Sequence, residues 1–296
     1  MISNRFIKFE LGKLLEQHGH EVAYFSMYDE RNIKTGNKEY FVKPFDGNSK
    51  NVFKAFTAIY SKGNKKVMEN ALEDFKPDIV HINLFQRHLT YSIIEAIKER
   101  NIPIVFTAQD LQAVCPARAM LCKGKICSKC LNASKFNCFK NKCVKNSALK
   151  SMLSSIECTR YKNKKVYDLI DVIISPSSFV GNLIKEDGVN TKVETIHNFV
   201  DVNNFKNDST EDGNYAFFLG RLSEEKGILN LLKAFSKQKS GLLYIAGDGP
   251  EKENIVNYIK EHKLQKRVKL LGFLNQEQVK EYISKASFVD FFSVIT

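Results

Sequence analysis

The sequence predicts an α/β protein built from two doubly wound, Rossmann-like domains that face a cleft. Short apolar runs bounded by turn residues alternate with stretches whose apolar residues recur at helical spacing. This alternation occurs twice, and a segment with the composition of a linker separates the two sets. With 296 residues and 43% hydrophobic content, the chain can bury a large core, which excludes a disordered or fibrous protein.

The first domain is expected to contain five buried parallel strands. Their apolar runs are Glu21–Met27, Asp78–Leu84, Ile102–Asp110, Asp171–Ser177 and Val193–Asn198. Between them, Tyr91–Arg100 and Phe179–Glu186 follow polar cap residues and have apolar positions at helical spacing. Strands and helices that alternate in this way favour a parallel sheet covered by helices.

The second domain is expected after a linker. The residues FVDVNNFKNDSTEDGN, which follow Asn198, include few apolar side chains and many Asn and Asp. We therefore divide the chain into domains 1–200 and 201–296. Strands are predicted at 215–220, 242–250 and 268–274, helices at 227–235, 251–263 and 276–286, and a last apolar run at 287–295. Ligands of such sheets bind outside the carboxyl ends of the strands, so the loops at those ends are the candidate sites.

The formal net charge of +12 is concentrated in one segment of the chain. Between Arg118 and Lys165, thirteen Lys and Arg residues stand against the single acid Glu157. We interpret residues 115–165 as a basic, Cys-rich insertion in the first domain. An anionic membrane surface, phosphates or an acidic acceptor are its expected partners, and a lysine-rich surface that contacts only solvent is the alternative.

Membrane-spanning and nucleic-acid-binding proteins fit the sequence less well. No stretch approaches the ~18–20 apolar residues of a membrane span, and the first residues lack the apolar segment of a secretion signal. We interpret the chain as cytoplasmic and, through its basic segment, as a candidate for peripheral association with the inner face of the cell membrane. A zinc-dependent nucleic-acid module is a weaker alternative, because the basic segment has few aromatic side chains for base stacking: Phe136, Phe139 and Tyr161.

Six of the seven cysteines lie between Cys115 and Cys143, inside the basic segment. Clustered thiols in a cytoplasmic protein suggest a metal rather than disulfides. Four of them have the spacing of a tetrahedral structural zinc site: Cys127, Cys130, Cys138 and Cys143. The surrounding lysines would favour thiolates. Free thiols remain an alternative, and an iron–sulfur cluster, suggested by the spacing from Cys122, is a weaker one.

The strongest motif follows the strand predicted at 215–220. Arg221 and Lys226 come after Gly220 at a strand end and precede a helix. A guanidinium fork, a compact ammonium and a helix N-terminus together suit a diphosphate. One strand later, Gly247 and Gly249 mark a place where the backbone passes close to a ligand or turns sharply.

Taken in order, FLGRLSEEKG, IAGDGPEKE and VKLLGFLNQEQVKEYISKA resemble the donor-binding half of glycosyltransferase family 4, which has the GT-B fold. The resemblance covers nearly the whole chain. In the first domain it includes GHEV, KPDIVHIN, IPIVFTAQDLQAVCP, DVIISPSSFV and IHNFVD, and some family members have a similar Cys-rich insertion.

The resemblance implies a retaining glycosyltransferase that moves a sugar from a nucleotide diphosphate sugar to a glycan or lipid-linked acceptor, without a catalytic metal. By resemblance, Arg221 and Lys226 neutralise the leaving diphosphate, and Gly220 lets the backbone approach it. The family has a His-Asp pair where this chain has Gln109 and Asp110. We name these two as the catalytic candidates, although Gln cannot carry a proton at neutral pH.

The resemblance also sets an expectation for the two ends of the chain. The family has a first strand and a Gly-rich loop before the helix at Arg5–Gln17, and a Gly-rich loop with paired glutamates after the last apolar run. We therefore expect an incomplete second domain and an unstable or inactive product unless the missing pieces are supplied elsewhere. The alternative function is a non-catalytic remnant or partner subunit, and cell-surface polysaccharide synthesis is the process that the family suggests.

Overall fold

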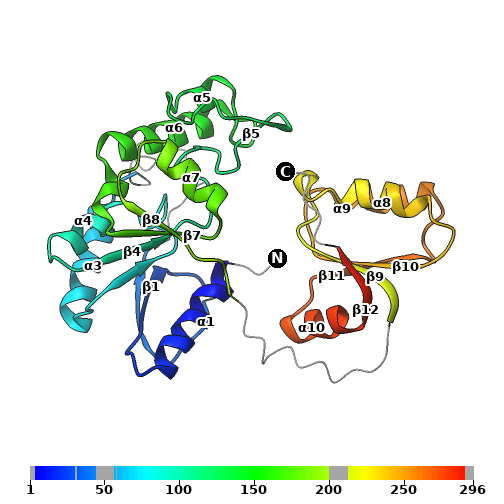
Figure 1. Cartoon of the computed structure of the whole chain (residues 1–296), viewed down its shortest axis with the longest axis horizontal. Coiled ribbons are helices and arrows are strands. Elements are labelled where there is room, and N and C mark those ends of the chain that lie inside the picture. The colour runs from blue at the N-terminus through cyan, green and yellow to red at the C-terminus, as the bar shows by residue number, and fades with distance from the viewer. Residues whose placement is uncertain (1–3, 31, 45–56, 58, 200–212, 291–296) are drawn as a thin grey trace. The chain divides into compact units, whose positions relative to one another are not determined.

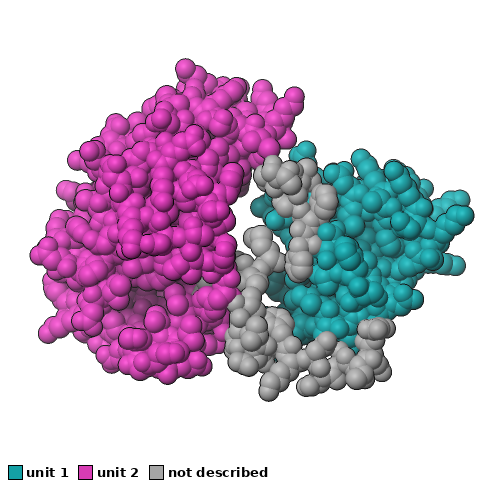
Figure 2. All heavy atoms as spheres, in the orientation of Figure 1, with its two compact units in different colours: residues 1, 200–296 teal, residues 2–199 magenta. Residues whose placement is uncertain are grey.

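The computed structural model describes residues 4–30, 32–44, 57, 59–199 and 213–290. The chain divides into two compact units, called unit 1 (residues 1 and 200–296) and unit 2 (residues 2–199) (Figure 2). The predicted linker falls almost entirely within residues 200–212, outside the described residues, as does the predicted apolar run beyond residue 290.

Unit 2 contains the five strands expected for the front of the chain, arranged in two sheets (Figure 1). The larger sheet is parallel, in the order β3 (Val80–Ile82), β4 (Ile104–Thr107), β7 (Val172–Ser175) and β8 (Lys192–Thr195). The smaller sheet pairs β1 (Ala23–Met27) with β2 (Lys38–Val42), also in parallel. The strand β2 was not predicted from the sequence.

Three helices of unit 2 begin at serine caps. The helices of this unit are α1 (Asn4–Gln17), α3 (Lys62–Phe75), α4 (Ser92–Lys98), α5 (Asn137–Lys140), α6 (Ala148–Asn163), the 3₁₀ turn η1 (Val166–Leu169) and α7 (Ser178–Glu186). The side chains of Ser61, Ser147 and Ser177 accept hydrogen bonds from the first turns of α3, α6 and α7. Such caps satisfy backbone N–H groups that have no partner inside the helix.

The core of unit 2 includes part of the segment that we interpreted as an insertion. The ring of Tyr161, in α6, lies 5.7 Å from the ring of Phe85 and 5.4 Å from that of Tyr91, measured between centroids. All three side chains are buried. Aromatic contacts of this kind stabilise a core beyond their buried area alone. The second half of α6 is thus integral to unit 2, although Lys162, Lys164 and Lys165, at and beyond its end, are exposed.

Unit 1 is a second parallel sheet with helices on both faces. Its order is β11 (Val268–Gly272), β10 (Leu242–Ala246), β9 (Gly213–Leu219) and β12 (Ala286–Asp290). Figure 1 shows α8 (Ile228–Ser236) and α9 (Lys252–Glu261) on one face and α10 (Gln276–Lys285) on the other. The two units therefore have Rossmann-like sheets, as predicted. Within the described residues, no helix has the length and apolar composition needed to cross a lipid bilayer.

Candidate active site

The loop after β9 is joined to the loop after β10 by backbone hydrogen bonds. Gly220 N donates to Ala246 O at 3.1 Å, Leu222 N donates to Asp248 O at 3.0 Å, and Glu251 N donates to Leu222 O at 2.9 Å. The side chain of Leu222 is buried in the core of unit 1. This pairing holds both loops at the carboxyl end of the sheet, where ligands of doubly wound folds bind.

Both predicted glycines of the second loop are required by this close approach. A Cβ atom on Gly247 would overlap the carbonyl oxygen of Gly220, and one on Gly249 would overlap that of Leu222. Gly247 also has a φ of 132°, which side-chain-bearing residues rarely adopt. The sequence suggested a ligand or a sharp turn at these positions. In the structure, the neighbour is the backbone of the adjacent loop.

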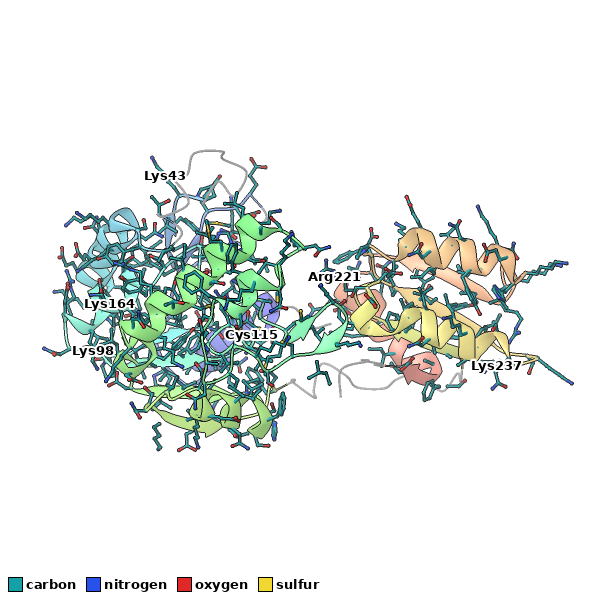
Figure 3. The ribbon with its side chains drawn as sticks, turned by 90° about the horizontal axis from the view of Figure 1, so that it is seen from above. Lys43, Lys98, Cys115, Lys164, Arg221 and Lys237 are labelled. Atoms are coloured by element: carbon teal, nitrogen blue, oxygen red, sulfur yellow. The ribbon has the colours of Figure 1, made fainter. Side chains whose placement is uncertain are left out.

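Arg221 and Lys226 lie on the loop that this pairing holds in place. Arg221 is exposed, and neither side chain forms an ion pair with a described carboxylate. Lys226 closes a 3₁₀ turn, η3 (Glu224–Lys226), through its N–H bond to Ser223 O at 3.0 Å. Gly227, the N-cap of α8, offers no side chain to the first N–H groups of that helix. The loop therefore presents unpaired cations beside a helix N-terminus, an arrangement suited to an anion. In Figure 3, Arg221 is at one end of unit 1 and Lys237 is at the opposite end.

Gln109 and Asp110, the catalytic candidates, follow β4 in unit 2. Gln109 Nε2 donates to Asn198 Oδ1 at 3.4 Å, which joins the loops after β4 and β8. Asp110 Oδ1 accepts from Gln112 N at 2.9 Å, and its Oδ2 atom pairs with Arg118 at 3.3 Å. The carboxylate of Asp110 is thus engaged in holding its own loop.

His81 lies on β3, next to β4, and contacts the residue near the end of that strand. Its Nε2 atom lies 2.7 Å from Thr107 Oγ1. Burial lowers the pKa of His81, because the charged imidazolium would lose its hydration. A neutral His81 is therefore the form that this edge of the sheet favours.

The single acid of the basic segment is buried and bonded to the loop after β4. Glu157, on α6, is 1% exposed. Its carboxylate accepts hydrogen bonds from Gln112 Nε2 and Tyr161 OH, both at 3.3 Å, and Arg87 lies 3.7 Å away. Burial raises the pKa of Glu157 despite these partners.

The two arginines of this region were not predicted as functional residues. Arg87 and Arg118 both have left-handed backbones, with φ of 67° and 69°. Non-glycine residues in this conformation are uncommon and are held in place by their surroundings. Neither arginine lies in a recognisable motif, so only the folded structure reveals that Arg118 pairs with Asp110 and Arg87 with Glu157.

The cysteines contact one another in a different grouping from the predicted one. The side chain of Cys143 lies close to those of Cys122 and Cys138, and Cys130 is buried nearby. Across the described residues, no three or more His, Cys, Asp or Glu side chains are arranged to hold a metal ion. The zinc site at Cys127, Cys130, Cys138 and Cys143 therefore stays a prediction of the sequence.

Burial has a larger effect on the pKa of Cys130 than Lys135, which lowers it, as expected of a neighbouring ammonium group. Burial raises the pKa of Cys130 to about 11 and also raises the pKa values of Cys138 and Cys143. Desolvation of the thiolate outweighs the attraction of the lysines, since most of those ammonium groups project into solvent.

One lysine of the basic segment is buried instead of exposed. Lys135 is 2% exposed, and its Nζ atom lies 2.7 and 2.8 Å from the two carboxylate oxygens of Asp187, the C-cap of α7. The same ammonium donates to Val114 O and Cys130 O, at 2.8 and 2.9 Å. The pair is fully hydrogen-bonded, and it fastens the Cys-rich segment to α7.

Comparison with known proteins identifies the family. The family model described as Glycosyltransferase Family 4 matches residues 9–204, and the one described as Glycosyl transferases group 1 matches residues 199–292. One relative is the N-acetylgalactosamine-N,N'-diacetylbacillosaminyl-diphospho-undecaprenol 4-alpha-N-acetylgalactosaminyltransferase of Campylobacter jejuni. The two sequences are 33% identical over 140 residues, which make up 44% of this chain and 37% of that protein. The chain is 34% identical over 68 residues to the O-antigen biosynthesis glycosyltransferase WclY of Escherichia coli, covering 23% of this chain and 19% of WclY. These alignments thus span well under two thirds of either relative.

Solved structures with the same fold cover nearly all of the chain. Sucrose-phosphate synthase from Thermosynechococcus elongatus matches with a TM-score of 0.63 at 15% identity, over 99% of this chain and 72% of that one. HepE from Anabaena, in complex with UDP and glucose, matches with a TM-score of 0.59 at 13% identity, also over 99% and 72%. From the family match over most of its length and these two Rossmann-like sheets, we conclude that the chain belongs to glycosyltransferase family 4 and has the fold of the GT-B enzymes.

Proposed function

We propose that the protein transfers a sugar, with retention of configuration, from a nucleotide diphosphate sugar to a glycan or lipid-linked acceptor in the assembly of a cell-surface polysaccharide. Residues 201–296 bind the donor, and residues 1–200 bind the acceptor. The observation that carries this proposal is the pair of cations, Arg221 and Lys226, on a loop that backbone bonds hold at the carboxyl end of β9.

The chemistry of the donor explains why this pair matters. When the glycosidic bond breaks, negative charge grows on the departing diphosphate. Arg221 can donate two parallel hydrogen bonds to its oxygens, while Lys226 adds a compact charge and α8 adds its first N–H groups. Because the loop is already fixed by its bonds to the β10 loop, little reorganisation accompanies the charge development.

The relatives indicate the chemical class of the two substrates. The Anabaena structure contains UDP and glucose, and the name of the Campylobacter enzyme includes a diphospho-undecaprenol acceptor. For this chain, we assign Gln109 to contact with the substrate through its amide. Asp110, held by Arg118 and by the N–H of Gln112, acts as a positioning residue for the loop that carries Gln109.

Titration of the purified chain with UDP, GDP and ADP tests the donor site. We expect one of these nucleotides to bind. Arg221→Gln should weaken that binding roughly 10- to 100-fold, since a charge-assisted hydrogen bond contributes about 1.5–3 kcal/mol. Lys226→Gln should show a similar or smaller loss. Lys237→Gln, at the opposite end of unit 1, is the matched control and should bind like the wild type.

Two results would count against the proposal. Equal nucleotide affinity in Arg221→Gln and the wild type would remove the cation pair from the donor site. Absence of binding to all three nucleotides would favour the alternative function, a non-catalytic remnant or partner subunit in which the two cations serve no donor.

A further inference from the structure

The outer surface of the Cys-rich segment has an unusual concentration of unpaired positive charge. No Asp or Glu occurs between Asp110 and Glu157. Seven lysines of this stretch are exposed, and none forms an ion pair with a described carboxylate: Lys123, Lys125, Lys129, Lys140, Lys142, Lys145 and Lys150. We call the surface formed by residues 121–152 the insertion face.

Large apolar side chains are exposed on the same face. Ile126 and Leu149 are each 69% exposed, and Phe136, Phe139 and Met152 are each 37% exposed. Four of them lie within two residues of an exposed lysine in the sequence, and Phe136 lies four residues from Lys140. Scattered exposed apolar residues need no explanation in a globular protein, but five of them within one short basic segment suggest a surface that contacts something other than water.

The elements that carry these side chains are fastened to one another. The hairpin of β5 (Leu121–Cys122) and β6 (Lys125–Ile126) lies close to the turn after α5 at Cys122 and Cys143. The segment after β6 is linked to α5 by Asn137 Nδ2, which donates to Lys129 O at 2.6 Å. The turn after α5 is fixed to α6 by Val144 N, which donates to Ser151 Oγ at 2.9 Å. In Figure 1, β5, α5 and α6 gather at one end of unit 2.

The buried pair of Lys135 and Asp187 then anchors this assembly to α7. The insertion face is consequently a surface of fixed shape, so that its lysines and apolar side chains meet a partner together. A preorganised surface loses less conformational entropy on binding than a flexible tail of the same composition.

We propose that the insertion face docks the enzyme onto an anionic lipid membrane. The lysines would contact phosphate headgroups, while the side chains of Ile126, Leu149 and Phe139 would enter the interfacial region between headgroups and acyl chains. Exposed lysines together with exposed aliphatic side chains favour a membrane over a nucleic acid. A nucleic acid would be bound by positive charge and stacking aromatic rings, and exposed aliphatic side chains would add nothing to that binding.

The docking has a consequence for the reaction, and this step rests on the proposed function. The chain passes from the loop with Gln109 and Asp110 directly into the Cys-rich segment, and Leu111 N donates to Arg118 O at 3.2 Å. A membrane-bound insertion face would therefore keep the acceptor edge of unit 2 close to the bilayer. A lipid-linked acceptor has its sugar and phosphate groups at that level.

Sedimentation of the full chain with vesicles tests the assignment. Vesicles of phosphatidylcholine with about 30% phosphatidylglycerol should bind the chain, whereas pure phosphatidylcholine vesicles should not. Raising the salt to about 0.5 M should weaken the binding. The triple variant Lys140→Glu, Lys145→Glu, Lys150→Glu should lower the partition coefficient about 100-fold or more. The double variant Ile126→Ser, Leu149→Ser should lower it about tenfold.

A matched control carries the same change of charge elsewhere. Lys237, Lys239 and Lys266 are exposed in unit 1, and their replacement by Glu should change vesicle binding less than about threefold. Circular dichroism and thermal unfolding verify that each variant is folded. Since the vesicle assay contains no nucleotide, and since nucleotide affinity is titrated separately in every variant, a failure of the donor proposal would not be confused with a failure of this one.

Three outcomes of the vesicle-binding assay itself would overturn the assignment. They are equal binding to neutral and anionic vesicles, vesicle binding that survives the triple substitution on the insertion face, and an equal loss in the unit 1 control. Displacement of the chain from vesicles by a short single-stranded RNA at lower concentration than by soluble phosphate would likewise overturn it, in favour of a nucleic-acid partner.

Discussion

The two candidate substrate edges of the protein are stabilised in different ways. In unit 1, the loops after β9 and β10 are joined by backbone hydrogen bonds that only glycine permits at Gly247 and Gly249. In unit 2, the loop after β4 and the segment that follows it are held by charged side chains that pair with one another, such as Asp110 with Arg118.

This difference decides which charged residues are available to a ligand. In unit 1, where backbone hydrogen bonds hold the loops, Arg221 stays exposed and has no described carboxylate partner. In unit 2, where side chains hold them, the carboxylate of Asp110 and the ammonium of Lys135 are occupied within the protein. Charged residues of the first edge are therefore candidates for direct contact with substrate, and several of those at the second edge are better explained as parts of the scaffold.

The largest effect should come from breaking the side-chain scaffold at its most buried point. Lys135→Met leaves the Asp187 carboxylate, 3% exposed, without its principal partner. We expect the free energy of unfolding to fall by about 3 kcal/mol, because the only described cation that the buried carboxylate then keeps is Lys162, whose Nζ atom lies 3.6 Å away and whose side chain is 39% exposed. Urea unfolding of the purified variant measures the loss.

Two further variants show whether burial is the reason. Lys135→Met combined with Asp187→Leu should recover much of the loss, since it removes both charges. Lys98→Met breaks an ion pair with Asp171 whose side chains are 42% and 43% exposed, and it should cost less than about 1 kcal/mol. Figure 3 marks Lys98 on the surface of unit 2. If Lys98→Met cost as much as Lys135→Met, burial would not be the cause.

A smaller effect is expected from disturbing the backbone pairing in unit 1. Gly247→Ala places a methyl group against the carbonyl oxygen of Gly220 and forces an unfavourable φ, so we expect a loss of roughly 2–3 kcal/mol together with weakened nucleotide binding. Gly272 also has a positive φ, of 69°, but a Cβ atom there meets no atom within 4 Å. Gly272→Ala should therefore cost only about 1–2 kcal/mol, the strain of the left-handed conformation. Equal losses in the two variants would show that steric overlap is unimportant.

The sequence predicted the two sheets because their apolar runs are bounded by turn residues and recur in a regular order. It did not predict α6, and the composition of that helix explains why. Much of its buried face consists of small or polar side chains, among them Ser151, Ser154, Ser155 and Cys158. Such residues give no apolar periodicity, so a helix that contributes Tyr161 to the core was interpreted as part of an exposed basic segment.

The candidate site of unit 1 was predictable to the same extent as its loops. Its residues form two short local motifs, Gly220 with Arg221 and Gly247 with Gly249. The two loops that carry these motifs are hydrogen-bonded to each other in the fold. In unit 2, by contrast, two partners of the buried Glu157, Arg87 and Gln112, come from distant segments of the chain. The pairing of Arg87 with Glu157 joins residues 70 positions apart, and no local pattern signals it.

The smallest predicted effect concerns the pH dependence of the side-chain scaffold. Burial raises the pKa of Glu157 above the ordinary value of 4.5. The protonated carboxyl of Glu157 therefore makes its full contribution to the unfolding free energy below pH 4.5. This contribution is lost as the pH rises through the raised pKa, because the folded state must then accommodate a buried carboxylate. Glu157→Gln has no such proton. Between about pH 4.5 and 8, the unfolding free energy of this variant should consequently gain on that of the wild type. Glu253→Gln, at an exposed position of α9, controls for the loss of one negative charge. The difference in unfolding free energy between Glu157→Gln and the wild type could instead stay constant across this range or move in the opposite direction. Either result would mean that Glu157 is ionised in the fold without penalty. The contrast between the two edges would then rest on geometry alone.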